Sequence, residues 1–139
     1  MAVASRRMRI AAAVCTYERY EFLATAIESL TRQSLSPSDY CVLVVDNSPS
    51  SDRRERSKRE WDGHEFVRYL TVDTPGLSNA RNVAAQETCA DIVAYLDDDA
   101  IAEPNWLAEV LSAFDDVQYV RVGRGGIGIQ RPLGAIHHV

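Results

Sequence analysis

The sequence predicts an α/β fold, Rossmann-like, in which a mostly parallel sheet carries helices on both faces. Short apolar runs alternate along the chain with segments whose apolar residues recur at helical spacing. These runs are apolar at nearly every position, which is typical of strands that are covered on both faces, as in a parallel sheet. The chain has 139 residues, of which 46% are hydrophobic, so it has enough apolar material for one core and one domain.

The first half of the chain supplies two predicted strands. Residues 9–15 form one, and residues 41–45 form another that ends at Asp46. The helix between them has an inward face made of Phe22, Leu23, Ala26, Ile27 and Leu30. The charged stretch 52–60 contains few apolar residues, and we expect it to be an exposed helix or a mobile loop.

The second half continues the alternation. Residues 66–72 alternate like a strand with one exposed face, and a helix is expected over residues 78–87. Its inward residues are predicted to be Leu77, Ala80, Val83 and Ala84. Residues 92–96 form the next predicted strand, and a helix over residues 104–114 follows, with Pro104 at a position that suits the first helical turn.

Composition excludes several classes of protein. The net charge of −5 argues against a protein that binds nucleic acid by neutralising phosphates. No apolar run approaches the roughly 18 residues that are needed to cross a bilayer. The three cysteines, Cys15, Cys41 and Cys89, lack metal-ligand spacing and lie in or beside apolar segments. We therefore expect reduced thiols in a cytoplasmic protein.

Three consecutive carboxylates, Asp97, Asp98 and Asp99, follow the apolar strand 92–96. Carboxylates this close repel one another, and a hard divalent cation such as Mn²⁺ or Mg²⁺ relieves the repulsion. The structural alternative is a solvated acidic turn before the next helix. The parallel sheet favours the cation, because ligands bind beyond the carboxyl ends of its strands. We expect Thr16, Asp46 and the acidic triplet all to lie at that rim.

Four segments resemble motifs of family 2 glycosyltransferases, which have the GT-A fold. They are Cys15-Thr-Tyr-Glu-Arg19, Val44-Val-Asp-Asn-Ser48, Gly76-Leu-Ser-Asn-Ala-Arg-Asn82 and Tyr95-Leu-Asp-Asp-Asp99. The segments occur in the order of the family and at its approximate spacing, and the resemblance covers residues 9 to 115. It implies the nucleotide-binding half of a GT-A enzyme, with a nucleoside-diphosphate sugar as donor.

The resemblance also implies a role for individual residues around the base. Thr16, Tyr17 and Glu18 would line the nucleobase pocket, although the family usually has Asn or Arg in place of Glu18. Asp46 would accept a hydrogen bond from the base. Structural alternatives stay open: an Asx-turn that begins at Asp46, core packing of Tyr17, and a first-turn acid at Glu18.

At the diphosphate end, the resemblance implies that Asp99 is the principal metal ligand. Asp98 would contact the ribose or assist at the metal, and Asp97 belongs to the same motif without a defined role. Arg81 would reach the diphosphate or the sugar, in agreement with the affinity of helix N-termini and guanidinium groups for anions. The alternative for Arg81 is an ordinary surface ion pair.

The last residues differ from the rest. We divide the chain into a nucleotide-sugar-binding GT-A half-domain at residues 1–116 and an atypical Gly- and Arg-rich tail at 117–139, which contains no acid. The fold is thus expected to be truncated after the acidic motif. Gly123, Gly125 and Gly128 match a dinucleotide fingerprint, which we reject because Pro132 interrupts it and no acid follows. The terminal pair His137-His138 is expected to be free.

The predicted function is transfer of a sugar from a nucleoside-diphosphate sugar to an unknown acceptor, with metal dependence and inversion of configuration. No general base is recognisable, so we expect the chain to be inactive as a fragment and to lack efficient turnover. The alternatives are a non-catalytic nucleotide-binding fragment, a nucleotidyltransferase-like protein or a phosphoacceptor signalling domain. Missing sheet strands would leave an apolar edge, which would favour self-association.

Overall fold

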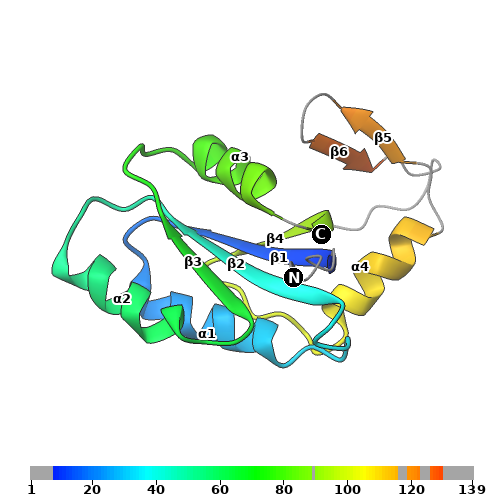
Figure 1. The fold of residues 1–139 in the computed structure, drawn as a ribbon, viewed down its shortest axis with the longest axis horizontal. Helices are drawn as coiled ribbons and strands as arrows, with labels where there is room; N and C mark the ends of the chain where they lie inside the picture. Colours follow the sequence, from blue (N-terminus) through cyan, green and yellow to red (C-terminus); the bar gives the residue numbers. More distant parts are fainter. Residues whose placement is uncertain (1–7, 89, 116–118, 123–125, 130–139) are drawn as a thin grey trace, which may run out of the picture.

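The computed structural model describes residues 8–88, 90–115, 119–122 and 126–129, and its centre is a four-stranded parallel sheet (Figure 1). The strands run in the order β3-β2-β1-β4. Their bounds are β1 (Met8–Thr16), β2 (Tyr40–Asp46), β3 (Val67–Thr71) and β4 (Ala90–Asp97). All three pairings are parallel, which confirms the predicted sheet. A separate antiparallel hairpin joins β5 (Tyr119–Val122) to β6 (Gly126–Ile129).

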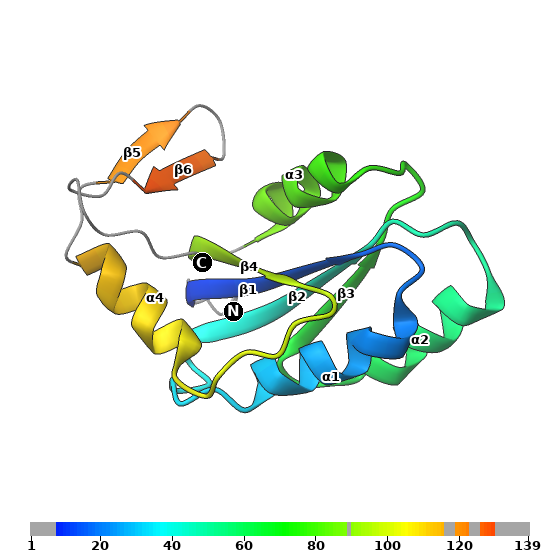
Figure 2. The same cartoon turned by 180° about the vertical axis from the view of Figure 1, so that it is seen from behind.

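In the part of the chain that the structure describes, four helices cover the sheet. They are α1 (Tyr20–Thr31), α2 (Asp52–Asp62), α3 (Leu77–Glu87) and α4 (Trp106–Asp115). Figures 1 and 2 show α1 and α2 against one face of the sheet and α3 against the other. The buried residues of α4 belong to the same apolar cluster as those of α1. Helices on both faces are therefore confirmed. No helix in the described ranges has the length and apolar character that a membrane crossing requires.

Alternation along β1 divides the core between the two faces. Ile10, Ala12 and Val14 pack in the cluster that contains α1 and α4, whereas Ala13 packs with Ala80 and Ala84 of α3. Each large aliphatic side chain that is fully buried stabilises the fold by about 1.5–3 kcal/mol. Three side chains of α1 fall in this class, namely Leu23, Ile27 and Leu30.

Two predicted core positions are wrong. Phe22 is 48% exposed, and its ring lies 5.8 Å from the guanidinium carbon of Arg19, so it faces the loop after β1. Leu77 is 58% exposed because it is the first residue of α3 and precedes the buried face of that helix. The other predicted inward residues of α1 are buried, as are Ala80 and Ala84 of α3.

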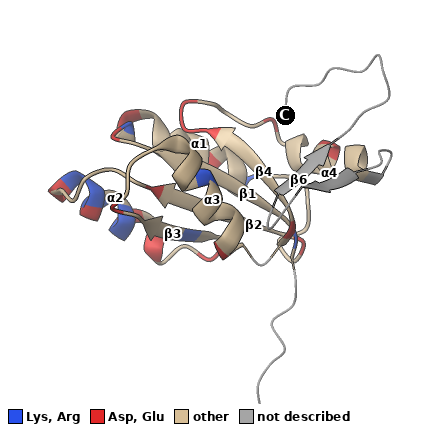
Figure 3. Ribbon diagram, turned by 90° about the horizontal axis from the view of Figure 1, so that it is seen from above, with Lys and Arg blue, Asp and Glu red and all other residues tan. Residues whose placement is uncertain are grey.

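The charged stretch after β2 is a helix, α2, which settles the choice between helix and loop. Its buried residues, Arg54, Ser57 and Trp61, follow one another at helical spacing, but only one of them is apolar. The hydroxyl of Ser51 caps the helix by accepting a hydrogen bond from the amide of Arg54 at 3.1 Å. Figure 3 shows basic and acidic residues side by side along this helix.

The side chain of Gln33, which follows the end of α1, fixes the start of α4. The helix begins at Trp106, two residues after the predicted Pro104. Gln33 is buried, and its side-chain oxygen accepts a hydrogen bond from the amide of Leu107 at 2.9 Å. Its side-chain nitrogen donates to the carbonyl of Glu103 at 2.8 Å. The side chain thus satisfies one of the unpaired amides in the first turn of α4.

The strand register brings the predicted polar residues to one rim. Thr16 pairs with Asp46 on β2, and Cys15 pairs with Asp97 on β4. Asp98 follows immediately, so the ends of three strands meet there, as predicted. In the hairpin, Gly128 lies in β6 and pairs with Val120 of β5, so it is part of a strand and not of the helix that a dinucleotide fingerprint requires. Cys89, Gly123, Gly125 and the pair at 137–138 lie outside the described residues.

Candidate functional site

A pocket of about 570 Å³ opens at the carboxyl ends of the strands. Four segments form it: the loop after β1, the tip of β2, the start of α3 and the acidic turn after β4. The lining residues are Cys15, Thr16, Tyr17, Arg19, Asn47, Pro75, Gly76, Leu77, Asp97, Asp98 and Asp99. Of the predicted site residues, the structure brings together Thr16, Tyr17 and the acidic triplet. Glu18, Asp46 and Arg81 do not line the pocket.

The floor of the pocket is a buried contact between β1 and the acidic turn. The hydroxyl of Thr16 donates a hydrogen bond to Oδ2 of Asp98 at 2.9 Å, and both residues are buried. Burial raises the pKa of Asp98, and the charges of Asp99 and Asp97 raise it further, whereas the Thr16 hydrogen bond and Arg19 oppose the shift. The hydrogen bond from Thr16 holds the side chain of Asp98 beside β1.

Arg19 is a site residue that the sequence reasoning quoted within a motif but assigned no role. Its Nη2 donates to Oδ2 of Asp99 at 2.7 Å, and its Nε lies 3.6 Å from Oδ1 of Asp98. The hydrogen bond to Asp99 raises the pKa of Arg19 above its usual value, so the guanidinium stays charged. The signal for this pair was available, because one short loop after β1 holds a cation at the same rim as three carboxylates.

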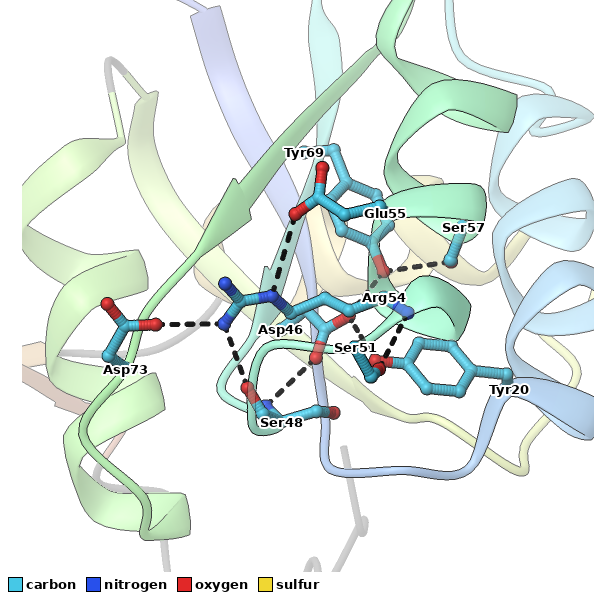
Figure 4. A network of polar contacts seen from close by, with 9 residues as sticks. All are labelled: Tyr20, Asp46, Ser48, Ser51, Arg54, Glu55, Ser57, Tyr69 and Asp73. Atoms are coloured by element: carbon cyan, nitrogen blue, oxygen red, sulfur yellow. Dashed lines mark hydrogen bonds and ion pairs between the residues drawn. The ribbon is translucent and has the colours of Figure 1, made fainter.

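Asp46 is buried beside the pocket and does not line it, so its predicted contact with a base stays a prediction. Its side chain is fully buried, and its Oδ2 accepts hydrogen bonds from the hydroxyls of Tyr69 at 2.7 Å and Tyr20 at 2.9 Å (Figure 4). Its Oδ1 accepts from the amide of Ser48 at 3.0 Å, which is the Asx-turn that we left open. Burial raises the pKa of Tyr20 to about 12, so this hydroxyl remains a donor.

The network around Asp46 extends into α2. Figure 4 shows Arg54 between the loop after β2 and Asp73. Its Nη1 donates to the carbonyl of Ser48 and to Oδ1 of Asp73, each at 2.9 Å. The hydroxyl of Ser57 lies 2.8 Å from that of Tyr69. These contacts hold the tip of β2 in place from behind the pocket.

Asn47 is the residue of β2's tip that lines the pocket, and the sequence reasoning gave it no role. Its Nδ2 donates to the carbonyl of Gly76 at 2.9 Å, and its amide donates to the carbonyl of Thr16 at 3.2 Å. Neighbouring residues of an extended chain point to opposite sides. With Asp46 committed to the interior, this alternation was the signal that Asn47 faces the opening.

Glu18 contributes its backbone to the site. Its φ is 55°, in the left-handed region, where Asn and Gly are favoured over Glu. Its amide donates to Oγ of Ser48 at 2.8 Å, which ties the loop after β1 to the tip of β2. The side chain is exposed and precedes α1, so Glu18 is neither a wall of the pocket nor a first-turn acid.

Arg81 is directed at an aromatic ring. Its guanidinium carbon lies 5.5 Å from the ring centre of Tyr95, whose hydroxyl donates to the carbonyl of Arg81 at 2.9 Å. Arg81 thus has an aromatic partner in the structure, and its predicted contact with the diphosphate stays a prediction. Cys15 lies nearby on β1, and burial raises the pKa of this thiol to about 11.

The acidic turn has the donor atoms that a divalent cation prefers, but only part of a ligand set. Within the described residues, no three His, Cys, Asp or Glu side chains are grouped closely enough to hold a metal ion. Asp98 and Asp99 supply carboxylate oxygens, which suit Mg²⁺ or Mn²⁺. Mg²⁺ in nucleotide sites is commonly held by one or two carboxylates together with phosphate oxygens and water. The two residues fit that arrangement.

Comparison with known proteins agrees with this geometry. The sequence model of Glycosyl transferase family 2 matches residues 12–135, so the match continues past Asp116, the last residue of the expected half-domain. A glucosyl-dolichyl phosphate glucuronosyltransferase of Haloferax volcanii is 31% identical over 78% of this chain and 35% of its own length. A validoxylamine A glucosyltransferase of Streptomyces hygroscopicus is 30% identical over 70% of this chain and 22% of its own length.

Solved structures show the same fold. Residues 1–349 of the TarS protein of S. aureus, in complex with UDP, superpose with a TM-score of 0.69 at 21% identity, covering 81% of this chain and 33% of that one. The mannosyltransferase PcManGT of Pyrobaculum calidifontis, in complex with GDP-Man and Mn²⁺, gives a TM-score of 0.66 at 22% identity, over 77% of this chain and 32% of that protein. This chain therefore spans about a fifth to a third of the length of these proteins. By the family match over most of its length, the chain belongs to glycosyl transferase family 2.

Proposed function

We propose that the pocket binds a nucleoside-diphosphate sugar and that the chain is the donor-binding part of a metal-dependent, inverting glycosyltransferase. The observation that carries this proposal is the convergence of Thr16, Asn47 and the acidic turn on one opening at the carboxyl ends of the strands. Its volume of about 570 Å³ is within the range of roughly 300–1,000 Å³ that is usual for small-molecule sites. The acceptor lies outside this proposal.

The base would bind between the loop after β1 and the start of α3. Tyr17 and Leu77 both line the pocket, and they are 47% and 58% exposed, so two apolar surfaces are open to a planar ring. Asn47 carries an amide, which can accept a hydrogen bond from the N–H of a uracil- or guanine-type base. In this proposal Asn47 takes the role that the sequence suggested for Asp46.

The diphosphate would lie across the pocket between Arg19, the start of α3 and the acidic turn. No side chain caps α3, whose N-cap residue is Gly76, and a free helix N-terminus attracts anions. Arg81 on the same helix adds positive charge to this end. Asp98 and Asp99 would hold Mn²⁺ or Mg²⁺, which neutralises charge on a departing diphosphate. The protein's own contribution is to fix these groups before the donor arrives.

Calorimetry with UDP and GDP, each with and without Mn²⁺, tests the proposal. We expect one nucleotide to bind, and to bind more tightly with Mn²⁺. Asn47→Ala should weaken its binding by roughly tenfold, because a buried hydrogen bond to the ligand is lost. Asn105→Ala is the matched control: its amide bonds to Glu109 at the start of α4, away from the pocket. Absence of binding with both nucleotides, or equal losses in the two variants, would refute the proposal.

A further inference from the structure

Arg19 holds the two carboxylates that would bind the divalent cation. Its Nη2 is 2.7 Å from Oδ2 of Asp99, and its Nε is 3.6 Å from Oδ1 of Asp98. We propose that Arg19 is an internal counter-ion that competes with the divalent cation for the acidic turn and, once displaced, binds the diphosphate of the donor. This inference rests on the proposed function, because it assigns a task to one more residue of the same pocket.

The acidic turn needs a positive partner even without a ligand. Asp97, Asp98 and Asp99 are consecutive, and like charges at this spacing destabilise one another. The loop after β1 places a guanidinium against two of them. A guanidinium and a divalent cation repel each other when both lie against one carboxylate, so the two positive groups compete for Asp99.

The two contacts of Arg19 differ in how easily they are released. The side chains of Arg19 and Asp99 are 48% and 46% exposed, and ion pairs at such exposed sites are weak. Asp98 is only 9% exposed and stays in position through its hydrogen bond from Thr16. A cation of twice the charge can therefore replace Arg19 at Asp99 while Asp98 remains in place.

The displaced guanidinium would remain within the pocket. Glu18, the residue before it, has its amide bonded to Ser48, which fixes the backbone of this loop. Arg19 is itself a lining residue of the pocket. A planar guanidinium can bind two phosphate oxygens at once. The side chain alone has to move, from a carboxylate of the protein to the diphosphate.

Binding of Mn²⁺ alone tests the competition. The full chain is titrated in 150 mM NaCl, and free Mn²⁺ is followed by electron paramagnetic resonance. We expect Arg19→Ala to bind Mn²⁺ roughly fivefold or more tightly than the unmodified chain, at the lower end of ordinary couplings between two ligands. Arg19→Lys keeps the charge, so it should bind Mn²⁺ less tightly than Arg19→Ala.

Arg53→Ala is a matched control. Arg53 is 58% exposed, pairs with Glu21 at 3.6 Å and lies over the ring of Tyr20, so it resembles Arg19 except for the acidic turn. Its loss should leave the Mn²⁺ affinity unchanged, because its contacts are with Glu21 and Tyr20 and not with the carboxylates of the acidic turn. With Mn²⁺ present, Arg19→Ala should bind UDP or GDP less tightly than Arg53→Ala does.

The outcomes separate this inference from the proposed function. Equal Mn²⁺ affinities for Arg19→Ala and Arg53→Ala, or no Mn²⁺ binding by any of these proteins, would overturn the competition. The Mn²⁺ titration contains no nucleotide, so tighter binding by Arg19→Ala supports the competition whether or not the chain binds UDP or GDP. Failure of nucleotide binding by the unmodified chain refutes the proposed function on its own. Thermal melting of each variant shows that it is folded.

Discussion

Two carboxylates at the same end of the sheet, those of Asp46 and Asp99, have opposite environments. Asp46, at the tip of β2, is fully buried and accepts hydrogen bonds from two tyrosines and a backbone amide. Asp99, in the turn after β4, lines an open pocket and contacts an exposed arginine. The position of a carboxylate at the end of a strand therefore does not decide its role. The role of the carboxylate depends on the hydrogen-bond donors that neighbouring helices and strands place beside it.

Asp46→Ala should have the largest effect, and it should act on stability. The hydroxyls of Tyr20 and Tyr69 and the amide of Ser48 would lose their acceptor in a buried place. We expect the free energy of unfolding to fall by about 3 kcal/mol, since each buried group left unsatisfied costs about 1–3 kcal/mol and the losses overlap. Urea unfolding measures the change.

Asp46→Asn is the matched control for that experiment, because it keeps an acceptor oxygen and the volume of the side chain. It should cost less stability than Asp46→Ala. If Asp46→Ala is as stable as the unmodified chain and loses only its affinity for UDP or GDP, the buried role is wrong and Asp46 contacts the base after all.

Asp99→Ala should act on nucleotide binding and have little effect on stability. We expect the Mn²⁺-dependent gain in nucleotide affinity to be lost, a decrease on the order of tenfold or more, as is usual when a metal site is damaged. Stability without metal should change little, because the removed ion pair is exposed and the acidic repulsion falls. Calorimetry and thermal melting measure the two quantities. Large destabilisation with unchanged nucleotide affinity would instead make Asp99 a structural residue.

Removing the hydroxyl of either tyrosine that binds Asp46 should have a smaller effect on stability, and the two losses should differ. Tyr69 is 3% exposed, and its hydroxyl contacts both Asp46 and Ser57, whereas Tyr20 is only half-buried. Tyr69→Phe should lower the free energy of unfolding by about 1.5 kcal/mol, and Tyr20→Phe by about 0.5 kcal/mol, because water replaces a lost bond more readily at the exposed site. Urea unfolding of both variants gives the order, and the reverse order would contradict this account.

A further small effect should be a gain in stability. Glu18 has a φ of 55°, which glycine adopts without strain, so Glu18→Gly should raise the free energy of unfolding by about 0.5–1 kcal/mol. Glu18→Ala keeps the Cβ atom and the strain, so it serves as the control and should give no such gain. Equal stabilities of the two variants, measured by urea unfolding, would show that the conformation carries no cost.

The strands and their common rim could be predicted because buried parallel strands are apolar at nearly every position. The division of roles between Asp46 and Asn47 could not, since it depends on hydroxyls from Tyr20 and Tyr69, which are far away in the sequence. The same holds for Arg19, whose partner Asp99 is 80 residues away. The sequence did not decide between helix and loop for α2, because its buried face includes the charged residue Arg54, which an apolar pattern does not predict to be buried.

The central claim is that the donor binds at the rim formed by β1, β2 and β4. Titration of the ¹⁵N-labelled chain with UDP or GDP and Mg²⁺, followed by NMR, tests it most directly. We predict the largest amide shifts at Asn47, Gly76 and Asp99, and none at Asp39 or Ala90, at the opposite ends of the strands. Shifts centred instead on the smaller pocket lined by Tyr20, Arg56 and Trp61, or no shifts with either nucleotide, would contradict the account.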